Sequence, residues 1–266
     1  MIIDTSREEF YIIDSIVTGH AFDIQNEFGR FCSEKIYQNE LALRCLNDNA
    51  LNTVSKEVSI NISCDDFTKE YQADLVINES FIYELKACRA LSSEHEAQLL
   101  NYLIITNNHY GKLINFGSTS VEYRFISTTL TAETKHECII DDDEWRGASP
   151  ASELFKSCFC QLLNEWGLFL EVSLYVEAVV TLLGADKHTD CFIPFLSEYG
   201  AIGGQKFHLL DGNAAFKISA VNKAQQTYEN NIIKLLAHTD LKCVHWVNMA
   251  GHHVTFKTII NPNKKY

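Results

Sequence analysis

The sequence predicts an α/β (α+β) protein in which one order of elements, αβββαβ, occurs twice along the chain. Two observations carry this prediction. Apolar residues recur at helical spacing in some segments and alternate or form short runs in others. The second half also repeats features of the first half at constant offsets. With 266 residues, the chain is long enough for two small domains.

The first half is expected to contain two helices, three strands, a further helix and then one or two strands. The ranges are helices at 10–29 and 33–47, strands at 58–62, 71–77 and 81–87, a helix at 93–105, and strands at 111–116 and 121–126. Asn78–Ser80 is a polar break that indicates an antiparallel hairpin between the second and third strands. Ser93, followed three residues later by Glu96, is a capping-box pattern that predicts the start of the helix.

The second half repeats these features at low identity. The segment Asn26–Phe31 matches Asn164–Phe169 at an offset of 138 residues, and Lys112–Asn115 matches His245–Asn248 at an offset of 133. An acidic run from Asp141 to Glu144 and a turn-rich segment up to Pro150 separate the halves. We therefore expect one domain over residues 1–135, a solvated linker over 136–150 and a degenerate second copy over 151–266.

Composition narrows the class of protein. The formal net charge is -13, and most of the negative excess lies in the first half, so a nucleic-acid contact must be local or assisted by a divalent cation. The 9 cysteines are scattered and contain no Cys-x-x-Cys pair, which favours free thiols in a reducing compartment over a zinc or iron–sulfur site. Neither a signal peptide nor a membrane span is expected, so the sequence predicts a cytoplasmic protein.

Three charged residues interrupt the apolar runs of the predicted hairpin. Asp74 lies on its first strand, and Glu84 and Lys86 lie two residues apart on its second strand, so the last two share one face. Isolated charges in such strands are costly to bury unless they are paired or hold a metal. Two neighbouring carboxylates suit Mg²⁺ or Mn²⁺, with the Leu85 backbone carbonyl as a further ligand, and a bound water can then act as nucleophile. Lys86 could orient or deprotonate that water or neutralise transition-state charge.

The repeat tests whether these charges serve the fold. At the matching positions the second half has Lys217 and Ser219 in place of Glu84 and Lys86. It has Phe207, or His208 after a one-residue slip, in place of Asp74. Glu34 falls on Val172, with Glu171 one residue away. The scaffold pattern persists while the charges are lost, which favours a functional role in the first half.

These residues carry a resemblance to a known family. The pattern Asp74, Glu84-x-Lys86 resembles the PD-(D/E)xK nuclease superfamily, and more closely its GxxExxY branch of bacterial proteins. The motifs that match that branch are Glu34-x-x-Tyr37, Ala73-Asp74-Leu75-Val76, Glu84-Leu85-Lys86, His95-x-x-Gln98-Leu99-x-x-Tyr102-Leu103 and Lys112–Gly117. The resemblance covers roughly residues 10–126 and implies a restriction-endonuclease-like core with the order αβββαβ. Phe31 replaces the name-giving glycine, and Ala73 stands where the superfamily often has proline.

The resemblance implies a role for each site residue. Asp74 and Glu84 would be metal ligands, Lys86 the catalytic lysine, and Glu34 an auxiliary acid that reaches in from the second helix. Gln98 and Tyr102, one turn apart on a helix face, would position substrate or the cluster. The alternatives are a solvated helix charge for Glu34, a surface polar residue for Gln98, core packing for Tyr102, and a structural ion cluster for the triad. His95 is expected at the helix start, and His245, His252 and His253 are not expected to bind metal, because adjacent strand residues point to opposite faces.

The leading hypothesis is a Mg²⁺- or Mn²⁺-dependent nuclease that hydrolyses phosphodiester bonds of nucleic acid, with DNA as the first candidate. The second copy would supply substrate grip or the face of a homodimer. One alternative is a non-catalytic nuclease-fold module that binds nucleic acid or a protein partner. Another is metal-dependent chemistry on a small phosphorylated molecule, for which the acidic charge would be expected.

Overall fold

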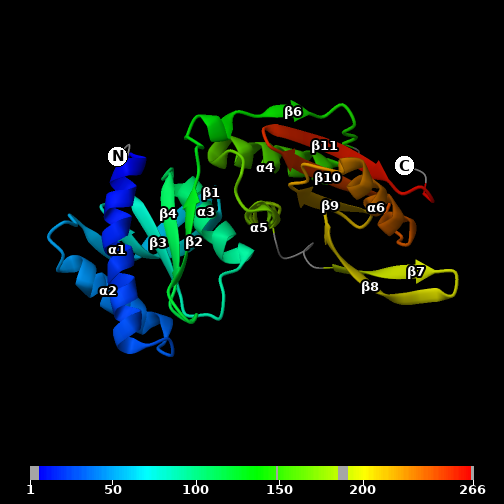
Figure 1. Cartoon of the computed structure of the whole chain (residues 1–266). Helices are drawn as coiled ribbons and strands as arrows, with labels where there is room; N and C mark the ends of the chain where they lie inside the picture. Colours follow the sequence, from blue (N-terminus) through cyan, green and yellow to red (C-terminus); the bar gives the residue numbers. More distant parts are fainter. Residues whose placement is uncertain (1–5, 148, 185–190, 265–266) are drawn as a thin grey trace. The chain divides into compact units, whose positions relative to one another are not determined.

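The computed structural model describes residues 6–147, 149–184 and 191–264, which form two compact mixed α+β units (Figure 1). The first unit comprises residues 1–62 and 69–132, and the second comprises 63–68 and 133–266. The mixed α+β fold class is therefore confirmed. All nine cysteines are free thiols. In the part of the chain that the structure describes, every helix is too short or too polar to cross a membrane.

The first unit contains the predicted elements in the predicted order. They are α1 (Arg7–Phe28), α2 (Glu34–Leu46), β1 (Val54–Cys64), β2 (Phe67–Ile77), β3 (Phe81–Lys86), α3 (Ser93–Thr106), β4 (Tyr110–Asn115) and β5 (Glu122–Ser127). The strand order in the sheet is β1-β2-β3-β4-β5. β3 and β4 run parallel because α3 carries the chain back between them, whereas β2 and β5 pair antiparallel with their neighbours.

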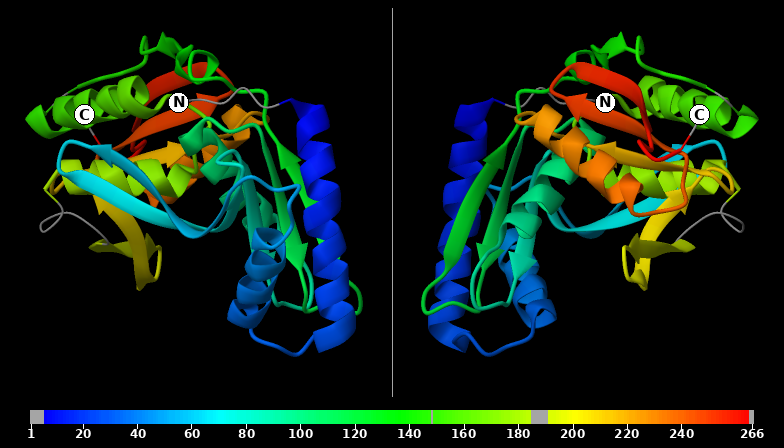
Figure 2. Two further views of the ribbon diagram at one scale, coloured as in Figure 1. Left: turned by 90° about the vertical axis from the view of Figure 1, so that its left-hand side faces the viewer. Right: turned by 90° about the vertical axis from the view of Figure 1, so that its right-hand side faces the viewer.

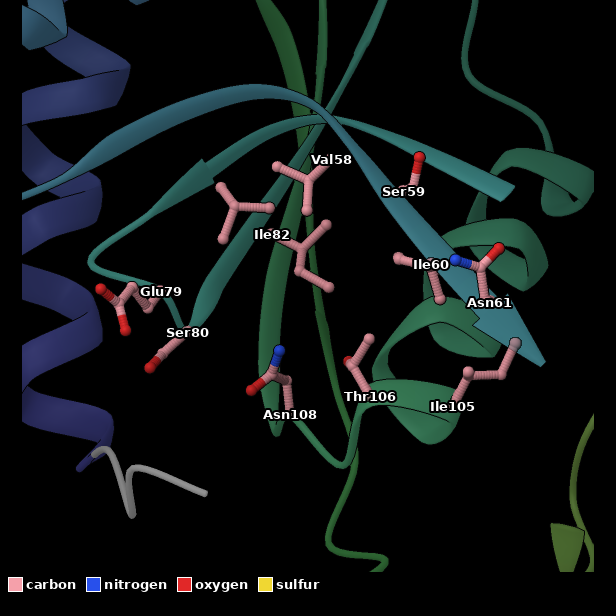
Figure 3. A pocket seen from close by; sticks show the side chains of 11 residues that line it. Val58, Ser59, Ile60, Asn61, Glu79, Ser80, Ile82, Ile105, Thr106 and Asn108 are labelled. Carbon is pink, nitrogen blue, oxygen red and sulfur yellow. The ribbon is translucent and has the colours of Figure 1, made fainter. Parts of the chain in front are cut away.

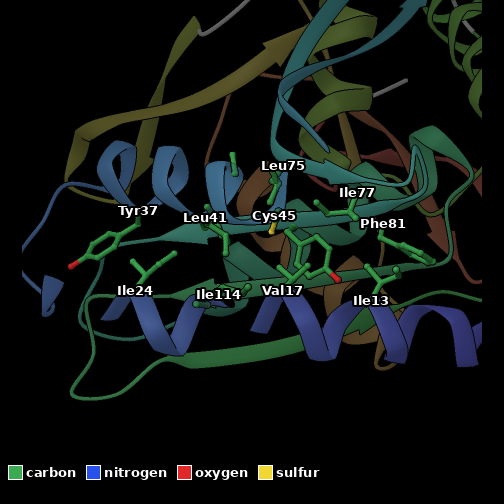
Figure 4. Close-up of a cluster of buried hydrophobic side chains, with 14 of the residues drawn as sticks. Ile13, Val17, Ile24, Tyr37, Leu41, Cys45, Leu75, Ile77, Phe81 and Ile114 are labelled. Carbon is green, nitrogen blue, oxygen red and sulfur yellow. The ribbon is translucent and has the colours of Figure 1, made fainter. Parts of the chain in front are cut away.

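The periodicity of α1 determines which of its faces is buried. Ser6 caps its first turn by accepting a hydrogen bond from the Glu9 amide, and Gly29 ends it at φ 73°, a value that favours glycine. The apolar stripe of α1 packs with α2 against one face of the sheet, and Figure 4 shows part of this core. The members shown and labelled are Ile13, Val17, Ile24, Tyr37, Leu41, Cys45, Leu75, Ile77, Phe81 and Ile114.

The other face of the same sheet carries α3. Leu99, Tyr102 and Leu103 of α3 pack with Ile82 of β3 and Leu113 of β4 in a separate apolar cluster. The two views in Figure 2 show the sheet of the first unit with α1 (blue) along one side. The sheet is thus covered on both faces, which explains why β3 is buried along most of its length.

The start of α3 differs from the expected capping box. The N-cap is Ser92, not Ser93, and its partner is His95, not Glu96. The Ser92 side chain accepts from the His95 amide, and the His95 ring accepts from the Ser92 amide. Ser92 has the extended backbone (φ -113°, ψ 168°) that an N-cap requires. His95 is therefore a helix-start contact, as expected, while Glu96 pairs with Arg124.

From its first α-helix onward, the second unit has the same succession of helices and strands, preceded by a short 3-10 helix and one extra strand. Its elements are η1 (Thr134–His136), β6 (Ile139–Asp141), α4 (Pro150–Trp166), α5 (Val172–Leu182), β7 (Cys191–Ser197), β8 (Gly200–Leu209), β9 (Ala214–Ser219), α6 (Gln225–Ala237), β10 (Cys243–Ala250) and β11 (His253–Ile260). Its strand order is β6-β11-β10-β9-β8-β7. From β7 to β11 this is the order of the first sheet, with β9 and β10 parallel and with antiparallel neighbours on both sides.

The segment expected to be a linker differs from that expectation. Ile139–Asp141 form β6, which pairs parallel with β11 at the edge of the second sheet. The acidic run is exposed, and two of its residues form ion pairs: Asp142 with Lys156, and Glu144 with Lys257. These backbone and charge contacts place residues 139–144 in the second unit.

Two contacts recur at equivalent places in the two units. The Tyr37 hydroxyl donates to the Gly29 carbonyl at 2.7 Å, and the Tyr175 hydroxyl donates to the Gly167 carbonyl at 2.7 Å. The Asn115 side chain accepts from the Cys88 amide at 3.0 Å, and the Asn248 side chain accepts from the Val221 amide at 2.8 Å. Each recurrence follows the offset of 138 or 133 residues seen in the sequence.

Candidate active site

The β2–β3 register brings Asp74 and Glu84 together. Leu75 pairs with Tyr83, so Asp74 and Glu84 are opposite each other on neighbouring strands. The Asp74 amide donates to Glu84 Oε1 at 3.2 Å, and the Leu85 amide donates to Asp74 Oδ2 at 2.7 Å. One oxygen of each carboxylate is therefore held by backbone, which orients both carboxylates.

Lys86 completes this cluster from the end of β3. Its Nζ lies 3.1 Å from Glu84 Oε2, on the same strand face two residues away. Glu84 is buried, with 2% of its side chain exposed, while the Lys86 side chain is 15% exposed. The ammonium group thus lies between a buried carboxylate and the surface.

Burial dominates the electrostatics of the cluster, and repulsion by Asp74 adds to it at Glu84. Burial and then the Asp74 charge raise the pKa of Glu84 to about 7, and burial also raises the pKa of Asp74. Burial lowers the pKa of Lys86, but Glu84 and Asp74 outweigh it and the net shift is upward. Lys86 is therefore an ammonium group at neutral pH, while burial disfavours the charged form of both carboxylates.

Gln38 is a member of the cluster that the sequence reasoning missed. Its amide nitrogen donates to the Asp74 carbonyl at 3.1 Å and to Asp74 Oδ1 at 3.3 Å. Gln38 is buried on α2, one turn after Glu34. That spacing was the only available signal, because i and i+4 share a helix face.

Gln98 and Tyr102 form a hydrogen-bonded pair on α3. The Gln98 amide donates to the Tyr102 hydroxyl at 2.7 Å. Burial raises the pKa of Tyr102 to about 12, with smaller contributions from Glu84 and Asp74 in the same direction. The tyrosine is 3% exposed and packs in the apolar cluster on the α3 face, so it combines a core position with proximity to the carboxylates.

Glu34 is less closely integrated than its expected role requires. It begins α2, is exposed, and helps to raise the pKa of Lys86 through its charge. Among the described residues, the hydrogen bonds of the cluster join Asp74, Glu84, Lys86 and Gln38 but not Glu34.

The donor set of the cluster fits a hard divalent cation. Asp74 and Glu84 supply carboxylate oxygens, and positive charge at this point would offset the burial that raises both pKa values and the Asp74 charge that adds to the shift of Glu84. Over the residues that the structure describes, however, no group of three or more His, Cys, Asp or Glu side chains converges as a ready-made metal site. A cation held here would depend on two carboxylates, backbone oxygens and water, a ligand set typical of Mg²⁺.

A pocket of about 420 Å³ is lined by residues of β1, of the β2–β3 hairpin near its turn and of the end of α3. Val76 and Ile82 in its wall are two residues from Asp74 and Glu84, and they pair with each other across β2 and β3. Figure 3 shows apolar side chains, among them Val58 and Ile82, together with polar groups such as Ser80, Thr106 and Asn108 around the pocket.

The corresponding positions of the second unit lack this chemistry. His208 pairs with Phe216 just as Leu75 pairs with Tyr83, so Phe207, without a slip, is the counterpart of Asp74. Ser219, at the position of Lys86, is buried, donates to Asn248 Oδ1 at 2.8 Å and accepts from the Trp246 indole at 2.8 Å.

The histidines of the second unit have separate partners. His245 is buried and contacts Thr258 and Cys243, and the His252 ring contacts the Glu137 carbonyl. These contacts give the rings ordinary structural roles.

A comparison with protein-family models agrees with the fold of the first unit. Residues 12–126 match the family model of the PD-(D/E)XK nuclease superfamily, so the N-terminal region has a nuclease-like fold of that superfamily. The search of curated proteins returned no match. Among solved structures, the "Crystal structure of SSO0001" is similar at 16% identity and a TM-score of 0.25. The match covers 48% of this chain and 55% of that chain, so it spans about half of that protein's length.

Proposed function

We propose that the first unit is a metal-dependent phosphodiesterase that hydrolyses nucleic acid, with DNA as the leading substrate. The observation that carries this proposal is the meeting of Asp74, Glu84 and Lys86 across β2 and β3. The superfamily match over residues 12–126 supports nuclease-type activity for this region. The sequence motifs that resemble the GxxExxY branch support assignment to that branch.

Each residue has a role that its environment supports. Asp74 and Glu84, with the Leu85 carbonyl and Glu34 as outer contributors, would hold Mg²⁺ or Mn²⁺. Such a cation supplies Lewis-acid activation of water and of the phosphate. Lys86, held as an ammonium group by the carboxylates, neutralises charge that develops on the phosphate oxygens.

Two glutamines position this cluster. Gln38 fixes the backbone and the carboxylate of Asp74, and Gln98 fixes the hydroxyl of Tyr102. Neither glutamine carries charge, so each can orient a neighbour without altering the charge balance of the cluster.

We also propose that the second unit is a degenerate copy of the first. The common strand order, the constant offsets and the recurring tyrosine and asparagine contacts support a duplication. Phe207, Lys217 and Ser219 replace the acidic pair and the lysine, so this copy is assigned a non-catalytic role, such as substrate grip or a homodimer face.

Metal-dependent cleavage tests the proposal. Purified protein is incubated with single- and double-stranded DNA and RNA in Mg²⁺, Mn²⁺ or EDTA. We expect cleavage only with metal, and a loss of at least about 100-fold in Lys86→Ala, as for removal of one transition-state donor. Lys217→Ala, an exposed strand lysine of the second unit, is the matched control and should cleave like wild type.

Binding of the same nucleic acids, measured beside cleavage, distinguishes the nuclease from a non-catalytic binding module. If none of the nucleic acids is cut but binding persists, the fold is a non-catalytic binding module. Cleavage that survives Lys86→Ala unchanged would remove the lysine from the mechanism.

A further inference from the structure

A second pocket lies where the chain leaves β3, directly beyond Lys86. It has a volume of about 490 Å³ and is lined by Arg30, Phe31 and Cys32 from the α1–α2 turn, Cys88 and Arg89 from the segment after β3, and Gly117. One lining segment follows Lys86 immediately, and the other ends two residues before Glu34. The pocket is therefore lined by the chain segments next to two residues of the proposed active site, Lys86 and Glu34.

Both walls of this pocket are fixed by hydrogen bonds. The Tyr37 hydroxyl accepts from the Cys32 amide at 3.1 Å and donates to the Gly29 carbonyl. On the other wall, Asn115 Oδ1 accepts from the Cys88 and Gly117 amides, each at 3.0 Å.

Close packing also fixes the floor of the pocket. A Cβ at Gly117 would lie 2.5 Å from the Cys88 carbonyl oxygen, so only glycine fits this approach. The pocket is thus preformed rather than a gap between loose loops.

The pocket carries two available positive charges. Arg30 and Arg89 are exposed, and in the described part of the chain neither joins an ion pair; the Arg30 guanidinium lies 5.1 Å from the centre of the Phe31 ring. By contrast, Arg44 and Arg124 are paired with glutamates. In a protein of net charge -13, two unpaired guanidinium groups beside one pocket form a local attraction for anions.

Phe31 adds an aromatic face to these charges. Its side chain is 90% exposed. A single exposed apolar residue is ordinary on a protein surface. Here the exposed ring lies beside the Arg30 guanidinium and lines the same pocket as Arg89. This combines the two features that bind single strands: charge for phosphates and a surface for base stacking.

The second unit loses this arrangement together with the acidic cluster. At the same offsets, Arg30 becomes Leu168, which is buried, and Arg89 becomes Asn222. Phe31 becomes Phe169. The two charges disappear from the copy that lacks Asp74, Glu84 and Lys86, while the fold persists.

We propose that Arg30, Phe31 and Arg89 form the contact for a single strand of nucleic acid, with the guanidinium groups on successive phosphates and the Phe31 ring stacked on a base. This inference rests on the proposed nuclease function and specifies its substrate as a single strand or a frayed end. A paired base inside a duplex does not offer its face to Phe31, so duplex affinity depends on the arginines alone.

Binding of fluorescent single-stranded and duplex DNA, followed by anisotropy in Ca²⁺ and in EDTA over a range of salt, tests the contact. Arg30→Gln/Arg89→Gln should weaken both DNA forms by roughly 10- to 100-fold and reduce the salt slope for single strands by about 1.5. Phe31→Ala should weaken single-strand binding by roughly 10-fold, as for loss of one stacked base, and leave duplex binding unchanged.

A variant at a distant arginine separates local contact from net charge. Arg7→Gln removes one charge at the opposite end of α1, about 33 Å from the turn, and should leave affinity within twofold. All these side chains are exposed, and circular dichroism checks the fold of each variant.

The outcomes distinguish this contact from catalysis. Affinity and salt slope like wild type in the double arginine variant, or no binding of any strand by wild type, would overturn the contact even if the protein cleaves DNA. Arginine-dependent binding without cleavage would support the contact and refute the nuclease function.

Discussion

Asn115→Ala is expected to weaken the first unit and to loosen the chain that follows Lys86. The Asn115 side chain is fully buried, accepts from the Cys88 and Gly117 amides, and donates to Glu122 at 3.1 Å. Alanine would leave two backbone donors without their partner. Its effect should therefore appear both in the free energy of unfolding and in the segment that carries Arg89.

The magnitude follows from the number of hydrogen bonds lost. An unsatisfied buried donor costs about 1–3 kcal/mol. Cys88 and Gly117 are only half-buried, so water can partly replace the asparagine. Two donors at the lower end of that range predict a loss of about 2–4 kcal/mol. This is a large part of the roughly 5–15 kcal/mol typical of a domain.

Asn248→Ala is the matched control in the second unit. Asn248 is also buried and accepts from the Val221 amide, but no proposed catalytic group adjoins it. Chemical denaturation, with amide hydrogen exchange to assign the loss to one unit, should show destabilisation of the first unit by Asn115→Ala and of the second by Asn248→Ala. Exchange at residues 87–89 should rise only in Asn115→Ala, and cleavage should fall about 10-fold only in that variant.

Two results would refute this reasoning. A loss below about 1 kcal/mol would mean that water replaces the asparagine at no cost. An equal drop of cleavage in both variants, measured where both are folded, would mean that the effect is general destabilisation rather than a loosened segment beside Lys86.

Three further predictions concern other buried groups. Gln38→Leu removes both hydrogen bonds that the Gln38 amide nitrogen donates to Asp74. This change should reduce cleavage about 10-fold and weaken the stabilisation of the first unit by Mg²⁺ in thermal melts; an unchanged melting shift would exclude a positioning role. Lys112 is 4% exposed, and its Nζ lies 2.7 Å from Asp14 Oδ2. Lys112→Met should lower the free energy of unfolding in urea by about 3–5 kcal/mol, because it leaves the Asp14 charge unpaired, and Asp14→Leu/Lys112→Met should recover most of that loss. Equal losses in the two variants would contradict a penalty from an unpaired charge. Burial lowers the pKa of His245 from 6.5 to about 4, so the unfolded state takes up the proton first as the pH falls. The free energy of unfolding of the second unit should therefore decrease by about 3 kcal/mol between pH 6.5 and pH 4. His245→Gln should reduce this pH dependence, and an unaltered pH dependence would assign it to other groups.

The sequence predicted the hairpin and its charges because both are local. Apolar runs fix the strands, and the turn fixes the register that opposes Asp74 to Glu84. Gln38 escaped prediction because its role depends on how α2 packs against β2, and a lone helical glutamine has no pattern of its own.

Other differences between the sequence-based expectation and the structure arise from tertiary contacts or from two equally good candidates in the sequence. Ser92 and Ser93 are adjacent candidates for one cap, and the structure selects the serine with extended backbone. Residues 139–141 lie at the start of the acidic run that indicated a linker, yet the edge of β11 pairs with them as a strand. The arginines of the pocket beyond β3 are distant in sequence and become neighbours only when β3 meets the α1–α2 turn.

Ser219 bears on whether the second unit could ever regain a site. Its hydroxyl is the acceptor for the Trp246 indole and a donor to Asn248, all three being buried. Lysine at this position would leave the indole without an acceptor. It would also place an ammonium group beside Phe207 and Lys217, which stand at the positions of the two carboxylates. We expect the free energy of unfolding to fall by at least about 1–3 kcal/mol. If the two units descend from one ancestor, the core of the second unit now depends on this serine. A change back to lysine alone would therefore destabilise the second unit without restoring the acidic pair.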